Sequence, residues 1–127
     1  MTGFPKHGCK GLRVILVEDS WHVGFGLKNL LLAWEVDVAG LVATAAEGER
    51  LTSEHAPDVA IVDLNLRGGE AAYGLIDRLH EQGVRVIVMT GYSQVRLAPG
   101  KAVAILHKPF SDEQLLAALH QVMKGTA

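Results

Sequence analysis

The stretch VAIVDLN at residues 59–65 runs through four consecutive apolar residues and then places an aspartate, Asp63, at the end of the run. A strand over residues 59–64 that is apolar without alternation is typical of a parallel sheet covered by helices on both faces. Comparable runs occur at residues 13–18, 38–43, 84–90 and 102–107. Segments with helical periodicity separate the runs, and this alternation predicts βαβ units.

The intervals between the strands contain signals for helices. Thr44 with Glu47, and Ser111 with Gln114, have the spacing of N-terminal capping boxes. The periodicity predicts another helix over residues 71–82.

The first predicted helix begins near Ser20. Gly24 and Gly26 should weaken its first turns, because glycine has a low helix propensity. One face of this helix is apolar, and we expect that face to pack against the sheet. Its members are Val23, Leu27, Leu30, Leu31 and Trp34.

The interval between Thr90 and Lys108 differs from the others. It contains few apolar residues, and Pro99 with Gly100 interrupts it, so only a short or irregular fourth helix is expected there. The predicted fold is therefore α/β: a flavodoxin-like, doubly wound sheet of five parallel strands with helices on both faces.

The composition narrows the class of protein. The chain has 127 residues, of which 49% are hydrophobic, a size and composition typical of one globular domain. The formal net charge of −2 gives no basic excess for binding nucleic acid. No apolar run approaches the roughly 20 residues that a membrane span needs. Cys9, the single cysteine, has no partner for an internal disulfide, and a reducing cytoplasm is the expected location.

Polar side chains follow four of the five predicted strands. Glu18 and Asp19 end the first strand, Asp63 the third, Thr90 the fourth and Lys108 the fifth. In an open parallel sheet the ligand site lies outside the carboxyl ends of the strands. We therefore expect these side chains to surround one site.

Three carboxylates at one site repel one another unless a cation is present. Mg²⁺ prefers hard oxygen ligands and usually joins one or two carboxylates to a phosphate. Asp19 and Asp63 are the expected direct ligands of Mg²⁺, together with the main-chain carbonyl of Asn65. Glu18 is expected to hold a metal-bound water.

The same residues suit phosphoryl transfer. Asp63 can act as the nucleophile and form an acyl phosphate. Lys108 supplies a positive charge for one phosphoryl oxygen, and the Thr90 hydroxyl can donate a hydrogen bond to another.

Glu18-Asp19, Asp63, Thr90 and Lys108-Pro109 resemble the defining residues of bacterial response-regulator receiver domains, over residues 12–124. The resemblance implies that the acidic pair binds Mg²⁺ and that Asp63 accepts a phosphoryl group from a sensor histidine kinase or a phosphotransfer protein. It implies that Thr90 and Lys108 contact that group and that the Lys108–Pro109 peptide is cis. A receiver is a signalling module, so turnover of small molecules is not expected.

Three features depart from the family pattern. Ile105 stands where an aromatic switch residue is usual, the loop after Asn65 lacks the common Met-Pro pair, and the segment between Thr90 and Lys108 is short. The stretch DLNLRGGEA, residues 63–71, is similar to a subgroup of stand-alone receivers associated with sensor kinases in alphaproteobacteria.

The expected domain organisation is a flexible leader over residues 1–11 and a receiver over residues 12–125, with no output domain. Such a protein would act by binding partners, by feedback on its kinase or as a phosphate sink. The apolar face of the last helix could also support a homodimer.

Two other functions remain open. A small phosphatase of the haloacid-dehalogenase type also uses an aspartyl phosphate, but it needs its nucleophile after the first strand and a second Asp two residues on, where this chain has Asn65. A pseudo-receiver that only docks partners is the other alternative. His107 could be a metal ligand or a phosphohistidine, although strand alternation directs it away from Lys108.

Overall fold

The computed structural model describes residues 8–66, 70–91 and 95–124 and contains a five-stranded sheet with four helices. The strand order is β2-β1-β3-β4-β5, and every pairing between neighbours is parallel. The strands are β1 (Arg13–Val17), β2 (Asp37–Val42), β3 (Val59–Asp63), β4 (Arg85–Thr90) and β5 (Ala104–His107). The helices are α1 (Trp21–Ala33), α2 (Ala45–His55), α3 (Glu70–Glu81) and α4 (Asp112–Lys124).

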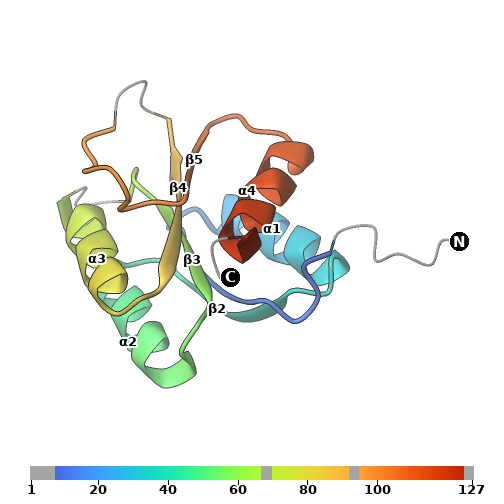
Figure 1. Ribbon diagram of the computed structural model, residues 1–127, viewed down its shortest axis with the longest axis horizontal. Helices are drawn as coiled ribbons and strands as arrows, with labels where there is room; N and C mark the ends of the chain where they lie inside the picture. Colours follow the sequence, from blue (N-terminus) through green and yellow to red (C-terminus); the bar gives the residue numbers. More distant parts are fainter. Residues whose placement is uncertain (1–7, 67–69, 92–94, 125–127) are drawn as a thin grey trace, which may run out of the picture.

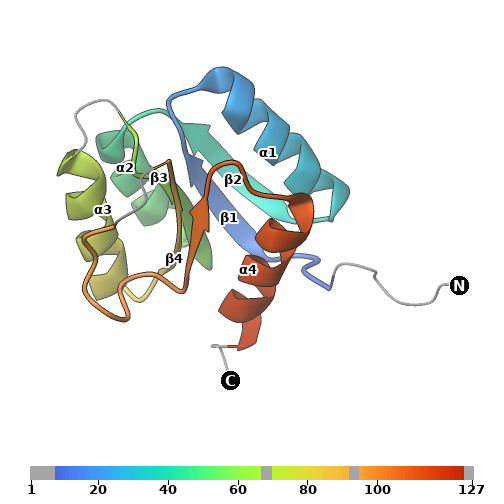
Figure 2. The ribbon, with the colours of Figure 1, turned by 90° about the horizontal axis from the view of Figure 1, so that it is seen from above.

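The helices cover both faces of the sheet. Helices α1 and α4 lie on one face, and α2 and α3 lie on the other (Figures 1 and 2). The predicted doubly wound α/β fold is therefore confirmed. From β1 the chain moves outward to β2 and then crosses back over β1 to β3, so the strand order reverses between the neighbours β1 and β3, where a ligand site is expected.

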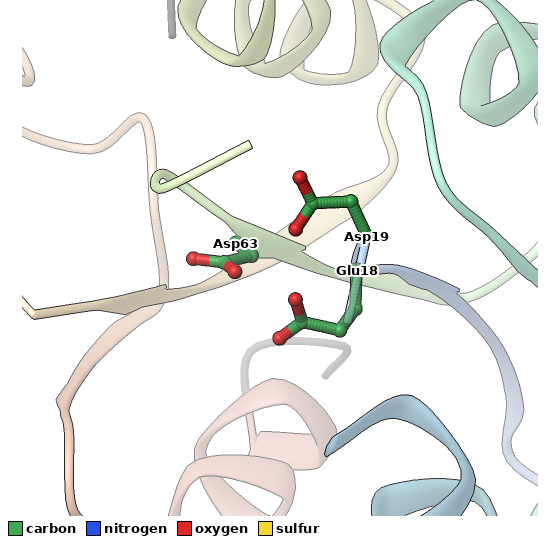
Figure 3. A group of neighbouring side chains, drawn as sticks. All are labelled: Glu18, Asp19 and Asp63. Carbon is green, nitrogen blue, oxygen red and sulfur yellow. The ribbon is translucent and has the colours of Figure 1, made fainter. Parts of the chain in front are cut away.

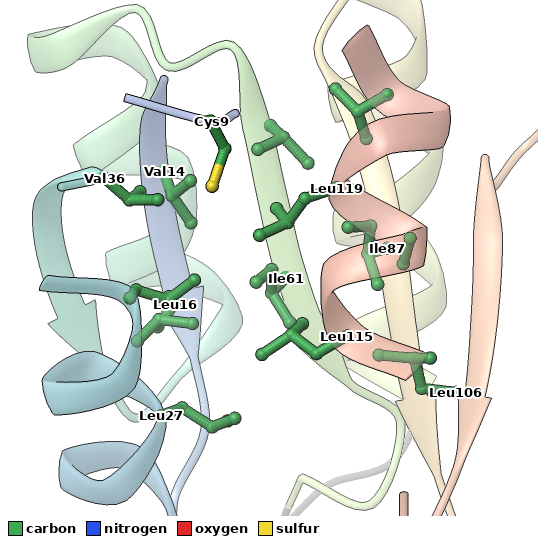
Figure 4. Packing of buried hydrophobic residues seen from close by; sticks show 14 of the residues in the cluster. Cys9, Val14, Leu16, Leu27, Val36, Ile61, Ile87, Leu106, Leu115 and Leu119 are labelled. Atoms are coloured by element: carbon green, nitrogen blue, oxygen red, sulfur yellow. The ribbon is translucent and has the colours of Figure 1, made fainter. Parts of the chain in front are cut away.

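Alternate residues of each central strand enter two separate hydrophobic cores. Val14 and Leu16 of β1 point into the core under α1 and α4, together with Ile61 and Leu119 (Figure 4). The intervening residues of β1 point into the core under α2 and α3. Burying one Leu or Ile side chain contributes about 1.5–3 kcal/mol, so consecutive apolar residues stabilise both layers. This explains why β1, β3 and β4 are apolar without alternation.

The helix ends agree with the signals in the sequence. Ser20 is the N-cap of α1, and its hydroxyl oxygen accepts a hydrogen bond from Val23 N. Ser111 and Gln114 form the reciprocal bonds of a capping box before α4. Thr44 caps α2 by accepting from Glu47 N, but the Glu47 carboxylate contacts the Thr44 hydroxyl instead of closing the box through the main chain.

The structure corrects two expectations about buried residues. Val23 is 40% exposed and does not belong to the buried face of α1, whereas Leu27 and Leu31 are buried. Cys9, expected in a flexible leader, is fully buried in the core of α1 and α4. This cysteine is therefore a core residue, and its burial raises the pKa of the thiol.

The connection from β4 to β5 is irregular, as expected. Residues 95–103 contain no helix, and residues 92–94 lie outside the described part of the chain. All predicted strands are present with ends within two residues of the predicted positions. Within residues 8–66, 70–91 and 95–124, no helix has both the length and the apolar composition of a membrane span.

Gly26 and Gly24 of α1 should respond differently to substitution by alanine. A Cβ at Gly26 would meet no atom within 4 Å, so Gly26→Ala is expected to raise the free energy of unfolding by about 0.5–1 kcal/mol. A Cβ at Gly24 would lie 2.8 Å from Leu41 Cδ1, and Gly24→Ala should lose most of that gain because Leu41 must move. Urea unfolding of both variants measures the difference, and equal gains would contradict this packing of α1 on β2.

Candidate functional site

The acidic residues predicted from the sequence meet at the carboxyl edge of the sheet. Glu18 and Asp19 follow β1, and Asp63 is the last residue of β3. Their side chains converge on one space (Figure 3), and one oxygen from each lies within 4.8 Å of the others. This spacing is suitable for carboxylates that share one divalent cation.

The Asp63 carboxylate is held at both oxygens. Its Oδ1 accepts a hydrogen bond from Asn65 N at 2.8 Å, and its Oδ2 accepts one from Lys108 Nζ at 3.0 Å. The residue is 1% exposed. The two hydrogen bonds hold the Asp63 carboxylate in one orientation, as a positioned nucleophile requires.

Glu18 is the carboxylate of the cluster whose hydrogen bonding is incomplete. It is 1% exposed, and only its Oε2 has a hydrogen-bond donor, Ser20 N at 3.1 Å. Its Oε1 is buried without a hydrogen-bond partner and lies 3.7 Å from Lys108 Nζ. Burial, and secondly the neighbouring Asp63 carboxyl, raise the pKa of Glu18 to about 7, against the opposing effects of Ser20 N–H and Lys108.

The unsatisfied Glu18 Oε1 indicates whether these residues are suited to bind a metal ion. A buried carboxylate oxygen without a donor, facing two other carboxylates, lacks what a hard divalent cation or its bound water would provide. The donor set contains only oxygen, as Mg²⁺ prefers. The acidic pocket is therefore compatible with Mg²⁺.

Thr90 and Lys108 follow Asp63 on the neighbouring strands, at the ends of β4 and β5. Lys108 N donates to Thr90 O at 2.8 Å, which joins the ends of β4 and β5 beside Asp63. The Lys108–Pro109 peptide is cis, as the resemblance to receiver domains implied. Thr90 is fully buried and stands one position past Met89, the β4 residue paired with Asp63.

The structure thus brings the side chains of Glu18, Asp19, Asp63 and Lys108 together, with Thr90 on the neighbouring strand, and the roles assigned to them stay predictions. The role of the Asn65 main-chain carbonyl stays a prediction. His107 is exposed at the end of β5, directly before Lys108. Trp21 is 55% exposed, stacks on Phe25 and lines a hollow beside Asp19.

One contact was missed by the sequence reasoning. The Asn65 side-chain Oδ1 accepts a hydrogen bond from Gly91 N at 2.9 Å, linking the loop after β3 to the residue after Thr90. The available signal was an asparagine two residues after Asp63, because such residues often bond to nearby main-chain groups.

The fold and the site define a class of protein, and comparison with known families agrees. Residues 14–120 match the model of the response regulator receiver domain, and the chain belongs to that family. Receiver domains are phosphorylated on an aspartate in two-component signalling. The receiver fold is that of a signalling module and not of an enzyme that turns over small molecules.

Individual relatives are similar at moderate identity. The oxygen regulatory protein NreC of Staphylococcus haemolyticus is 28% identical over 123 residues, which cover 90% of this chain and 56% of NreC. The chain spans about half the length of the curated relatives it matches.

Two solved structures have the same fold. The REC domain of the PhyR response regulator from Erythrobacter litoralis superposes with a TM-score of 0.77 at 21% identity, covering 91% of this chain and 92% of that one. The BeF3-activated conformation of SdrG from Pseudomonas melonis Fr1 gives a TM-score of 0.75 at 25% identity, covering 90% and 98%.

The raised pKa of Glu18 makes the stability of the metal-free protein depend on pH. Since the folded pKa is about 7 and the ordinary value is 4.5, the folded state keeps a proton that the unfolded chain has released. Stability in EDTA should therefore fall as pH rises from about 4.5 to 7, by on the order of 3 kcal/mol in all, and then level off.

Glu18→Gln should remove this loss, whereas Glu81→Gln, on the exposed end of α3, should retain it. Thermal unfolding between pH 5 and pH 8 compares the three proteins. A wild-type profile as flat as that of Glu18→Gln would contradict the assignment.

Proposed function

We propose that Asp63 accepts a phosphoryl group from a histidine of a sensor kinase or a phosphotransfer protein, in a Mg²⁺-dependent phosphorelay. One observation carries this proposal. The buried Asp63 carboxylate has an ammonium group 3.0 Å away, and its neighbours are two further carboxylates that can share a cation. These groups would supply a nucleophile, a charge that neutralises the incoming group and a site for the metal.

In the transfer, an oxygen of Asp63 attacks phosphorus. The P–O bond forms as the P–N bond to the donor histidine breaks, and the electron pair of that bond stays on the imidazole. Phosphoryl transfer depends mainly on positioning and on neutralising the charge of the equatorial oxygens. Lys108 is placed to bind one of these oxygens, and the Thr90 hydroxyl can donate to another.

Glu18, Asp19 and Asp63 would hold the metal, with the main-chain carbonyl of Asn65 as a further ligand. Bound Mg²⁺ would supply positive charge beside the phosphoryl oxygens. The buried Oε1 of Glu18 supports this set, because it is left without a donor by the protein itself.

The proposed unit is a receiver over residues 12–125 that works through protein partners. Binding of a target, feedback on the kinase and storage of phosphate all use the same phosphorylated state. The net charge of −2 favours protein partners over direct contact with nucleic acid. The free, buried thiol of Cys9 fits a reducing compartment such as the cytoplasm.

Asp63→Asn should abolish phosphorylation by acetyl phosphate in the presence of Mg²⁺. The amide keeps the size of the side chain but is a far weaker nucleophile. Asp77→Asn, on the exposed side of α3, is the matched control and should react like the wild type. Phosphate-affinity gels and intact-mass measurements detect the phosphorylated product. Phosphotransfer assays of the wild type and Asp63→Asn with the histidine kinases of the source genome identify the donor. Equal labelling of Asp63→Asn and wild type would contradict the proposal.

Lys108→Ala should have opposite effects on Mg²⁺ binding and on the rate of phosphorylation. The Lys108 ammonium lies 3.0 Å from Asp63 and 3.7 Å from Glu18 and so competes with a divalent cation for these carboxylates. The variant should bind Mg²⁺ more tightly, on the order of tenfold, yet be phosphorylated much more slowly. Calorimetry and the gel assay measure the two effects, and weaker Mg²⁺ binding would contradict this role of Lys108.

A further inference from the structure

Asn65 connects the two loops that border the phosphoacceptor site. Its main-chain N–H donates to Asp63 Oδ1 at 2.8 Å, and its side-chain Oδ1 accepts from Gly91 N at 2.9 Å. Gly91 directly follows Thr90. A single residue therefore contacts both the acceptor carboxylate and the end of β4.

The bond to Gly91 replaces a main-chain link of the sheet. Leu64 N donates to Met89 O at 2.9 Å, and in a regular parallel ladder Gly91 N would next donate to Leu64 O. Here the Gly91 N–H donates to the Asn65 carboxamide instead. A side-chain acceptor can leave by rotation about its own single bonds, whereas a ladder bond breaks only when the strands separate.

We propose that the Asn65 carboxamide is a positioning group that holds Gly91 N–H while Asp63 is unphosphorylated and releases it upon phosphorylation. This inference rests on the proposed phosphorylation of Asp63. Asn65 N already bonds to Asp63 Oδ1, so a phosphoryl group on Asp63 arrives beside this residue. The group is a charged acceptor that repels the carbonyl oxygen of the amide and competes for nearby N–H donors.

The neighbouring contacts limit the effect of losing the Asn65–Gly91 hydrogen bond to Gly91 itself. Thr90 O stays bonded to Lys108 N at 2.8 Å, so the end of β4 is fixed on the side of β5. Gly91 itself is exposed, and a Cβ built there would lie 3.8 Å from Asn65 Oδ1, which is ordinary contact. Releasing the Asn65 carboxamide therefore frees the backbone at Gly91 and leaves the pairing of β4 intact.

The test compares the binding of beryllofluoride, a phosphoryl analogue, at saturating Mg²⁺. If the bond to Gly91 must break on binding, Asn65→Ala has already lost it and should bind beryllofluoride about two- to tenfold more tightly than the wild type. Asn29→Ala, on the exposed face of α1, is the matched control and should bind like the wild type. Equal or weaker binding by Asn65→Ala overturns the inference.

Amide hydrogen exchange at Gly91 provides a readout that does not require phosphorylation. The Gly91 amide should be protected in the wild type and exchange faster in Asn65→Ala, which lacks the side-chain acceptor. An amide that exchanges equally in the wild type and Asn65→Ala overturns the inference. Failure of the wild type to bind beryllofluoride, or equal binding by Asp63→Asn, would instead overturn the proposed function.

Discussion

Crowding of negative charge at the carboxyl edge of the sheet is the constraint on which this site depends. Glu18, Asp19 and Asp63 place ligand oxygens within 4.8 Å of one another, and Lys108 is the cation that contacts two of these carboxylates in the described part of the chain. The buried oxygen of Glu18 remains unsatisfied, and the pKa of Glu18 is raised to about 7. The fold stabilises this arrangement through two hydrophobic cores that fix the strand ends from both sides.

The sequence was sufficient to predict the fold and to predict that Glu18, Asp19, Asp63 and Lys108 lie together. Apolar runs without alternation predicted a sheet covered on both faces, and β1, β3 and β4 are indeed buried throughout their central residues. The site followed from a topological rule, because residues at the carboxyl ends of parallel strands meet at one edge. Glu18, Asp63 and Lys108 could be placed together on that ground alone.

The remaining features depend on tertiary contacts that periodicity does not fix. Val23 falls on the apolar face of an ideal helix, but the rotation of α1 on the sheet leaves it exposed. Cys9 is buried because the segment before β1 folds back toward Trp34, and no local pattern predicts that contact. The bond from Gly91 to Asn65 depends on the spacing of two loops and on one side-chain rotamer.

The account predicts one divalent metal ion bound directly by Asp19 and Asp63. Anomalous diffraction from crystals grown with Mn²⁺ tests this most directly, since Mn²⁺ takes the same oxygen ligands as Mg²⁺. The expected result is a single strong peak between these two carboxylates, at about 2.0–2.2 Å from their oxygens. A structure with no peak there, in which Lys108 remains the sole cation beside Asp63, would contradict the account.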